Sequence, residues 1–277
     1  MAKSYFQLIQ EAKSQLESHG KEGHAIQSVF LTRKKWDITT WLLQMHNPSL
    51  PEDEEQLTSD LRQLLADVPP QYLTGQEAFF GRTFVVSDAT LIPRPETEEL
   101  VDQCLKHVQS EACHVVDIGT GTGAIAVTLK AERPLWQVAA VDLSSEALVI
   151  AQKNAKCIGS EVTFYHGDTL VPVKNQTWDV IISNPPYISS DEWSVMDASV
   201  RQFEPKMALF ADDQGLAMYK KIASQAQSCL AENGWLFLEI GYRQGPAVQQ
   251  IFQAAFPKKE VQVKKDLFGK PRMVIVH

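Results

Sequence analysis

The spacing of apolar residues divides the chain into three stretches. In the first, apolar residues such as Phe6, Ile9 and Leu16 recur at helical spacing. This spacing predicts helices over residues 5–17, 38–46 and 54–68. The pair of prolines at 69–70 stops the last of them, because proline lacks the N–H that a helix needs. No strand pattern occurs before Phe79.

The second stretch, residues 79–93, alternates apolar and polar positions and is rich in β-branched and aromatic side chains. Gly81 is a turn candidate, so we expect a β-hairpin here that connects a helical domain to the rest of the chain. The expected domains are therefore a helical N-terminal domain over residues 1–76, a hairpin linker over 77–95 and a larger domain over 96–277.

In the third stretch, strand and helix patterns alternate. Six short aliphatic runs are typical of strands, at residues 114–119, 137–144, 162–168, 178–183, 234–241 and 272–277. Helical spacing occurs at residues 123–134, 145–159, 215–234 and 246–256. Repeated β-α units with short loops predict an α/β fold of Rossmann type, with a mostly parallel sheet covered by helices on both faces.

Composition narrows the class of protein. Hydrophobic residues make up 44% and charged residues 22%, which is ordinary for a globular chain. No run approaches the roughly 18 apolar residues of a membrane span, and the first residues lack the apolar core of a signal peptide. The scattered cysteines and histidines show no ligand spacing, so we expect a cytoplasmic protein with no metal site and no membrane association. A net charge of −8 disfavours stable nucleic-acid binding, which needs a concentrated basic surface.

A glycine-rich turn, in VVDIGTGTGAIAV, follows the first predicted strand of the sheet. Gly119, Gly121 and Gly123 remove side chains where a backbone has to approach a ligand, and the next helix offers free N–H groups. Asp142 ends the second strand, about twenty residues farther on, where a carboxylate can accept hydrogen bonds from both ribose hydroxyls. Asp117 lies in an apolar strand and needs compensating donors. These features predict a nucleoside cofactor site at the carboxyl ends of the strands.

The glycine loop alone leaves two cofactors open. Gly119, Gly121 and Ala124 satisfy the G-x-G-x-x-A form of a dinucleotide site, which is typical of NAD enzymes. Residues 117–123 also match the D-x-G-x-G-x-G pattern of S-adenosylmethionine sites in Rossmann-type methyltransferases. The fourth predicted strand favours the methyl donor, because it runs into SNPPYI.

The NPPY segment has the groups needed to hold a planar nitrogen. The side-chain oxygen of Asn184 can accept a hydrogen bond from an incoming N–H. Pro185 and Pro186 keep the backbone extended, so that its carbonyls remain available as acceptors. Tyr187 adds an aromatic wall that can stack on a flat group or lie near a sulfonium. This combination predicts methyl transfer to an amide or amino nitrogen, catalysed by positioning and without a general base.

Motifs and flanking sequence together resemble one family. D-x-G-x-G-x-G followed by NPPY is shared by DNA adenine methyltransferases and by the methyltransferases of glutamine in release factors. The stretch PPQYLTGQEAFFGRTFVVSDATLIPRPETEELV resembles the bacterial peptide chain release factor N(5)-glutamine methyltransferases, the HemK/PrmC family. So do FEPKMALFADDQGLAMYKKI, FLEIGYRQG and KDLFGKPRMV, which extends the resemblance from about residue 60 to the C-terminus.

The resemblance implies a fold and a reaction. The sheet would be that of a class I methyltransferase, with its last strand antiparallel, and the cofactor S-adenosyl-L-methionine. The substrate would be the glutamine of the Gly-Gly-Gln (GGQ) loop in class I peptide chain release factors. The helical N-terminal domain would recognise that partner, and we expect the enzyme to be a monomer.

The resemblance also implies residue roles. Catalysis and glutamine binding fall to the NPPY residues, Asn184, Pro185, Pro186 and Tyr187, and Asn184 also touches the methyl donor. Besides Asp142 at the ribose, the implied cofactor contacts are Asp117, Gly119, Thr120, Gly121, Thr122, Gly123, Asp168 and Thr169. Many members carry a tryptophan against the adenine where this chain has Thr169, while Asp168 remains to reach the adenine amino group. For residues 94–98 an interdomain clamp and a substrate contact are equally open.

Three other functions are alternatives. An adenine amino-group DNA methyltransferase is the first, but the acidic balance and the lack of a basic target-recognition segment count against it. An NAD oxidoreductase ranks below it, because NPPY has no role in hydride transfer. A non-catalytic binding module comes last, because all cofactor and acceptor positions are intact.

Overall fold

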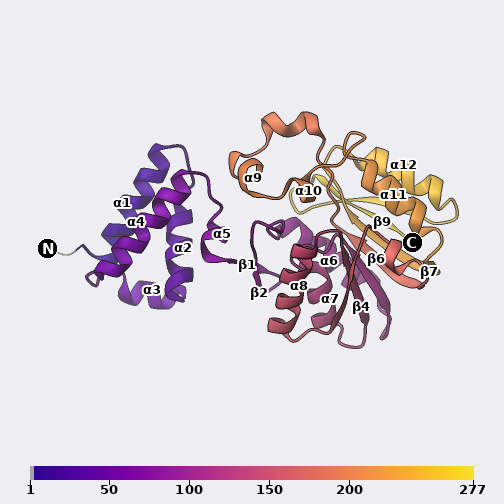
Figure 1. Cartoon of the computed structure of the whole chain (residues 1–277), viewed down its shortest axis with the longest axis horizontal. Helices are drawn as coiled ribbons and strands as arrows, with labels where there is room; N and C mark the ends of the chain where they lie inside the picture. The colour runs from indigo at the N-terminus through magenta and orange to yellow at the C-terminus, as the bar shows by residue number, and fades with distance from the viewer. Residues whose placement is uncertain (1–2) are drawn as a thin grey trace. The chain divides into compact units, whose positions relative to one another are not determined.

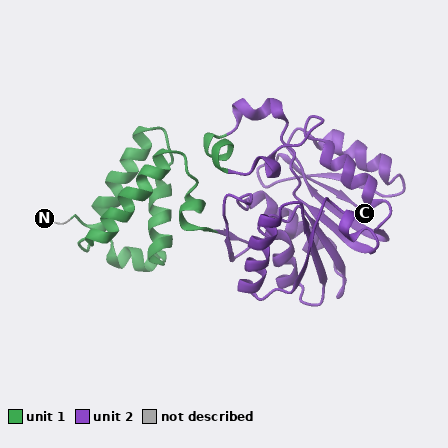
Figure 2. Cartoon of the chain, in the orientation of Figure 1, with its two compact units in different colours: residues 1–76, 197–203 green, residues 77–196, 204–277 purple. Residues whose placement is uncertain are grey.

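The computed structural model describes residues 3–277 and divides them into two compact units (Figure 2). One consists of the residues up to 76 together with residues 197–203. The other consists of residues 77–196 and 204–277. No helix among the described residues is long and apolar enough to cross a bilayer.

The N-terminal residues form a small helical unit. Its helices are α1 (Tyr5–Ser18), α2 (His24–Lys34), α3 (Ile38–Gln44), α4 (Pro51–Leu65) and α5 (Pro70–Thr74). Ser4 begins α1 by accepting a hydrogen bond from the backbone of Gln7, and Asp37 begins α3 by accepting one from Thr40. Apolar side chains of α1, α2, α3 and α4 form one core, with Ile9 fully buried at its centre.

Helix α2 was not among the predicted helices, although Ile26, Val29 and Phe30 have helical spacing and are buried. Arg33 donates two hydrogen bonds to Asp60, at 2.8 and 2.9 Å, and Asp60 is only 2% exposed. Lys34 likewise contacts Asp53 of α4 at 2.9 Å. Charged residues therefore take positions toward α4 that a simple amphipathic pattern would give to apolar residues. These two long-range ion pairs hold the C-terminal end of α2 to α4, beyond its buried apolar residues.

The expected hairpin is present. Strands β1 (Gln76–Phe79) and β2 (Arg82–Val85) form a two-stranded sheet. Phe80 and Gly81 between them both have positive φ, 50° and 71°, as a tight two-residue hairpin turn requires. The backbone N–H of Phe80 donates to Glu98 at 2.7 Å, which helps to hold this non-glycine residue in the left-handed region.

The larger unit contains a seven-stranded sheet in the order β5-β4-β3-β6-β7-β9-β8 (Figure 1). The parallel strands are β3 (His114–Ile118), β4 (Gln137–Asp142), β5 (Val162–His166), β6 (Trp178–Ser183) and β7 (Leu230–Glu239). The last strand, β9 (Pro271–Val276), runs antiparallel to β7 and to β8 (Val261–Lys265). The mostly parallel sheet with an antiparallel last strand is thus confirmed, and the strand order reverses between β3 and β6.

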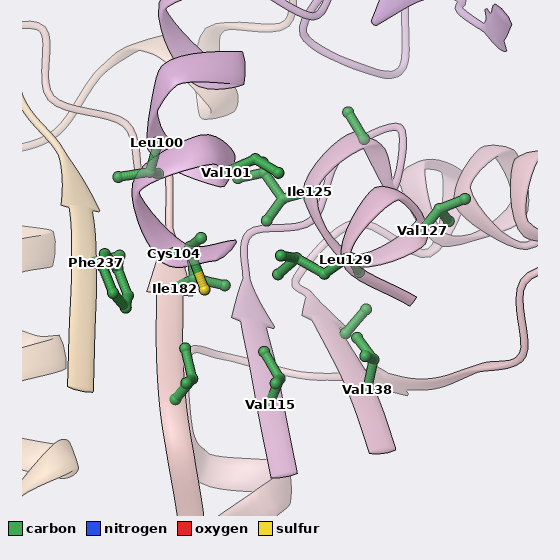
Figure 3. Close-up of a cluster of buried hydrophobic side chains, with 14 of the residues drawn as sticks. Leu100, Val101, Cys104, Val115, Ile125, Val127, Leu129, Val138, Ile182 and Phe237 are labelled. Atoms are coloured by element: carbon green, nitrogen blue, oxygen red, sulfur yellow. The ribbon is translucent and has the colours of Figure 1, made fainter. Parts of the chain in front are cut away.

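Two groups of helices cover the two faces of the sheet (Figure 1). One face packs against α6 (Pro95–His107), α7 (Ala124–Glu132) and α8 (Ser145–Ile158). The other packs against α11 (Ala217–Ala226) and α12 (Gly245–Ala255). Figure 3 shows α6 and α7 meeting β3, β4, β6 and β7 through aliphatic side chains and Phe237. Adjacent residues such as Val115 and Val116 enter opposite clusters, so each central strand is apolar on both sides.

Several elements differ from the sequence prediction. Helix α6 and strand β8 were not predicted; β8 lies at the edge of the sheet, and its sequence VQVKK lacks the long apolar run of a central strand. The helix predicted over 215–234 ends at Ala226, because residues from Leu230 onward pair with β6. The segment between β6 and α11 contains short helices that periodicity does not reveal: η2 (Ser190–Val195), α9 (Ala198–Phe203) and α10 (Lys206–Leu209). A further short helix, η1 (Val171–Val173), follows β5.

Candidate active site

A cleft opens where the strand order reverses. Ile118 of β3 is paired with Ser183 of β6, so the residues that follow them, Gly119 and Asn184, leave the sheet side by side. The cleft contains about 830 Å³ of empty space, a volume that includes the solvent at its open mouth. Its lining includes seven of the predicted site residues: Gly119, Gly121, Asp142, Asp168, Thr169, Asn184 and Pro186.

The glycine loop needs its glycines for two different reasons. Gly119, Gly121 and Gly123 all have positive φ, at 69°, 54° and 81°. A Cβ added at Gly119 or Gly121 would meet nothing within 4 Å, because both face open space. A Cβ at Gly123 would lie 3.2 Å from the Cβ of Ala151 and from a methyl of Val127. The first two glycines therefore leave room for a ligand, whereas Gly123 allows close packing of α7 against α8.

Asp117, in strand β3, holds the glycine loop through hydrogen bonds. It is fully buried, and Oδ2 accepts hydrogen bonds from the Thr120 hydroxyl at 2.6 Å and from the Ala126 N–H at 3.3 Å. Burial raises the pKa of this carboxyl to about 7. Its Oδ1 is buried without a hydrogen-bond partner among the described residues, which marks a place where an additional donor would be accommodated. Asp117 and Thr120 do not line the cleft, so direct cofactor contact by either stays a prediction.

Asp142, at the end of β4, faces the cleft. Oδ2 accepts a hydrogen bond from Gly121 N–H and Oδ1 accepts one from Ser144 N–H, both at 2.8 Å. Burial raises the pKa of Asp142, and these two N–H donors oppose the rise. Each carboxylate oxygen retains further lone pairs, so the side chain can accept from a diol as well.

The loop after β5 forms another part of the lining. Thr169 has φ of 51°, an unusual conformation for a β-branched residue, and its hydroxyl donates to Gln225 at 2.6 Å. Gln225 also accepts from the backbone of Leu170 at 2.9 Å. Asp168 beside it forms an ion pair with Lys221. Thr169 is thus held by α11, so this part of the cleft lining is a small, anchored side chain.

The NPPY segment leaves β6 beside the glycine loop. Asn184 is half-buried, and its Nδ2 donates to the hydroxyl of Thr97 at 3.0 Å, which leaves Oδ1 available as an acceptor. The Tyr187 backbone carbonyl accepts a hydrogen bond from the Gln244 side chain at 2.8 Å. The Tyr187 hydroxyl lies 3.4 Å from the carboxylate of Glu239. Burial raises the pKa of Tyr187 well above its usual value, so the phenol stays neutral.

Four predicted site residues besides Asp117 and Thr120 lie outside the cleft lining: Thr122, Gly123, Pro185 and Tyr187. Thr122 is buried, and its carbonyl accepts from Asn154 of α8 at 2.9 Å. The same Asn154 side chain bonds the backbone N–H and carbonyl of Val85, at 2.7 and 3.0 Å, so it ties the hairpin to the glycine loop. The assigned contacts of these four residues stay predictions.

Sequence reasoning gave no individual role to three buried polar residues around the site: Thr97, which lies in the segment 94–98 singled out above, Glu204 and Glu239. Glu239 ends an apolar strand, the same signal that drew attention to Asp117, and it was available in FLEIG. Thr97 and Glu204 carry no such local signal. Thr97 is bonded to Glu239, which lies 142 residues away in the sequence. Glu204 is paired with Arg94, which lies 110 residues away.

Two segments that line different parts of the cleft are joined by Glu204. Residues 89–91 line one part, and Pro205, Met207 and Ala208 line another. The Glu204 side chain is only 1% exposed; it pairs with Arg94 and accepts from the Ile92 N–H at 3.3 Å. This buried carboxylate therefore connects the chain before α6 to the chain before α10.

Replacing Glu204 by alanine is expected to lower the free energy of unfolding by about 2–3 kcal/mol, because it leaves Arg94 and the Ile92 N–H without their hydrogen-bond acceptor. The loss is smaller than for a fully buried pair because Arg94 is 34% exposed. Urea titration measures it, with the exposed Glu161 changed to alanine as the control. Equal stability of the two variants would contradict a connecting role for Glu204.

Two domain-family models match different parts of the sequence. The PrmC N-terminal domain matches residues 7–75, and the Methyltransferase small domain matches residues 97–204. The release factor glutamine methyltransferase of Enterococcus faecalis is 54% identical over 275 residues, 99% of each chain. The protein of that name from Streptococcus pneumoniae is 40% identical and covers 98% of this chain and 97% of its own.

Solved structures share the fold at much lower identity. A methyltransferase from Pyrococcus furiosus superposes with a TM-score of 0.54 at 20% identity, over 79% of this chain and 98% of its own. The hMettl16 catalytic domain also gives 0.54, at 16% identity over 71% of this chain and 76% of its own. These similarities support the sheet topology alone. The sequence matches extend over the full chain, and by them the protein belongs to the release factor glutamine methyltransferase family.

Proposed function

We propose that this protein transfers a methyl group from S-adenosyl-L-methionine to the side-chain amide nitrogen of the GGQ-loop glutamine in class I peptide chain release factors. The observation that carries the proposal is the arrangement of Asn184. Its amide nitrogen donates to Thr97, and its oxygen is left as an acceptor in the cleft at the carboxyl ends of the strands. Relatives that match over the full chain bear the name of this activity.

The cleft residues fit the cofactor. Asp142 provides acceptors for the ribose hydroxyls, and Gly119 and Gly121 leave space for the ligand beside the backbone. Asp168 and Thr169 would lie at the adenine. S-adenosylmethionine supplies a methyl group activated by its attachment to a sulfonium.

The chain's own contribution is to bind and orient the amide. An amide nitrogen is a poor nucleophile, because its lone pair is delocalised into the carbonyl. Asn184 Oδ1 and the Pro185 carbonyl would accept one hydrogen bond each from the amide NH2, which fixes the plane of the group and the direction of its lone pair. The nitrogen becomes acidic once it carries the methyl group, so its proton leaves without a dedicated base.

The glycine loop provides a matched pair of variants. Gly121 and Gly159 both have positive φ and open space where a Cβ would lie, but only Gly121 lines the cleft. Alanine at either position is expected to cost about 1 kcal/mol of stability, because of the left-handed backbone. Only Gly121→Ala should also weaken binding of S-adenosylhomocysteine, by about tenfold or more, because a methyl group fills ligand space. Calorimetric titration measures both affinities; equal affinities would contradict this position for the ligand.

The decisive test of the function uses methyl-labelled S-adenosylmethionine and three acceptors. These are an intact class I release factor, the same factor with its GGQ glutamine changed to alanine, and unmethylated DNA. Label on the intact factor alone is the expected result. Equal label on both factors would refute glutamine as the acceptor, and label on DNA would establish the adenine methyltransferase alternative. The net charge of −8 speaks against DNA as a substrate.

The proposal also covers the compartment, the oligomeric state and the recognition of the partner. We expect the enzyme to act in the cytoplasm as a monomer, with the helical domain over residues 1–76 recognising the release factor. Light scattering on the free protein tests the monomer. Binding of the release factor to protein with and without residues 1–76 tests recognition, provided that the shortened protein still binds S-adenosylhomocysteine.

A further inference from the structure

A chain of buried hydrogen bonds lies behind the NPPY segment. Thr97, in the first turn of α6, is 5% exposed, and Glu239, at the end of β7, is 2% exposed. Asn184 Nδ2 donates to Thr97 Oγ1 at 3.0 Å, and Thr97 Oγ1 donates to Glu239 Oε2 at 2.6 Å. Three segments far apart in sequence, the start of α6 and the ends of β6 and β7, thus meet in one chain of hydrogen bonds. We call this chain, Asn184–Thr97–Glu239, the relay.

The relay has a direction. A threonine hydroxyl has a single hydrogen, and here it points to the Glu239 carboxylate, which only accepts. Toward Asn184 the hydroxyl oxygen can therefore only accept, so it selects the NH2 end of the carboxamide. Turning the Asn184 carboxamide by half a turn would bring two acceptor oxygens together and lose this hydrogen bond.

The same carboxylate also contacts the aromatic wall. The Tyr187 hydroxyl lies 3.4 Å from Glu239 Oε1, and Tyr219 of α11 donates to the Glu239 backbone carbonyl at 2.8 Å. The charged groups acting on Glu239 are Arg272 of β9 and Glu96 of α6. Glu239 is therefore surrounded by groups of the active-site region, although it does not line the cleft itself.

We propose that Thr97 and Glu239 are positioning residues that lock the carboxamide of Asn184 with its oxygen toward the substrate amide. This inference rests on the proposed function, because it concerns how the acceptor for the glutamine NH2 is oriented. Neither residue touches the reacting atoms. Thr97 acts through Asn184, and Glu239 acts through Thr97 and Tyr187.

The orientation depends on Glu239 being ionised. Burial raises the pKa of Glu239 to about 7, and hydrogen bonding by Thr97 and the charge of Arg272 oppose the rise. A protonated Glu239 can donate to Thr97, which then can donate to Asn184 Oδ1 and turn the carboxamide away from the substrate. The active form is the ionised one, so the rate should fall as pH decreases through about 7.

The test compares Thr97→Val with Thr97→Ser. Valine has the same shape but no hydroxyl, and we expect the single-turnover rate to fall about 10- to 100-fold, the effect of losing one buried hydrogen-bond partner on the population of the correct orientation. Serine restores the hydroxyl and should recover most of the rate. Thr128→Val is the matched control, because Thr128 is also buried and its hydroxyl has no partner among the described residues.

Two further readouts separate positioning from mere stability. The NMR signals of the Asn184 side-chain NH2 should shift in Thr97→Val and stay in place in Thr97→Ser. Because the pKa of Asp117 is also about 7, the readout is a comparison of profiles: the fall in rate below about pH 7 should be smaller in Thr97→Val and in Glu239→Gln, whose side chain does not titrate, than in the wild type. A flat wild-type profile between about pH 5.5 and 8.5 would overturn the role of Glu239.

Failure of this inference differs from failure of the proposed function. An active wild-type enzyme whose Thr97→Val variant matches Thr97→Ser in rate and in the Asn184 signals would overturn the relay. A wild-type protein that methylates no release factor would instead overturn the function, and the NMR comparison would still decide whether Thr97 orients Asn184.

Discussion

Asn184→Ala is expected to lower the rate of glutamine methylation about 1,000-fold, the upper range for removing one preorganised polar group at a reacting centre. The variant loses the side-chain acceptor for the substrate NH2, and the Pro185 carbonyl alone leaves the amide free to rotate. The rest of the site should persist, because Asn184 is half-buried and its side chain is bonded to Thr97 rather than to the glycine loop. Single-turnover methylation of an intact release factor measures the loss.

Binding and stability distinguish this result from misfolding. The affinity of Asn184→Ala for S-adenosylhomocysteine should fall by no more than about tenfold, because Asp142 and the glycine loop are unchanged. Asn233→Ala, at an exposed asparagine outside the cleft, should behave as wild type. A rate for Asn184→Ala within about tenfold of wild type would refute Asn184 as the acceptor that orients the amide.

Asp142→Ala is expected to weaken binding of S-adenosylhomocysteine about 100- to 1,000-fold, since hydrogen bonds to a charged acceptor contribute about 1.5–3 kcal/mol each. The carboxylate accepts from Gly121 and Ser144, and under the proposed function it would also accept from the ribose hydroxyls. Its loss therefore removes ligand contacts and releases the loop that shapes the cleft. Calorimetric titration measures the change.

Ligand analogues separate the two roles of Asp142. If its carboxylate binds the ribose hydroxyls, the penalty of Asp142→Ala should be much smaller for a 2′-deoxy analogue of S-adenosylhomocysteine than for the parent compound. An equal penalty for both ligands would mean that Asp142 acts only by holding the Gly121 backbone. Asp142→Asn should be intermediate, because its side chain keeps one acceptor but places an NH2 near an existing donor.

The local parts of the site were readable from the sequence. The glycine loop and Asp142 follow from the alternation of strands and helices, because each β-α unit places its turn at the same edge of the sheet. The two prolines after Asn184 likewise predict where β6 ends. These signals depend on backbone chemistry within a few residues, so they survive without knowledge of the fold.

The long-range hydrogen bonds around the site could not be predicted from the sequence in this way. Thr97 meets Asn184 across 87 residues and Glu239 across 142, and nothing in PETE or FLEIG marks them as partners. Residues 94–98 illustrate the point: two roles were open from sequence, whereas the structure shows Arg94 paired with Glu204 and Thr97 with Glu239. The ion pairs from Arg33 and Lys34 of α2 to α4 are likewise long-range, although the apolar spacing of α2 itself was present in the sequence.

The sequence by itself determined the class of fold and the place of the glycine loop and the NPPY segment at one edge of the sheet, because turn chemistry and periodicity are local properties of the chain. Only the tertiary structure decided which group the Asn184 carboxamide bonds and how the walls of the cleft are joined. A buried hydrogen bond requires donor and acceptor to coincide in space, and that coincidence arises from packing α6, β6 and β7 together rather than from the neighbours of any one residue.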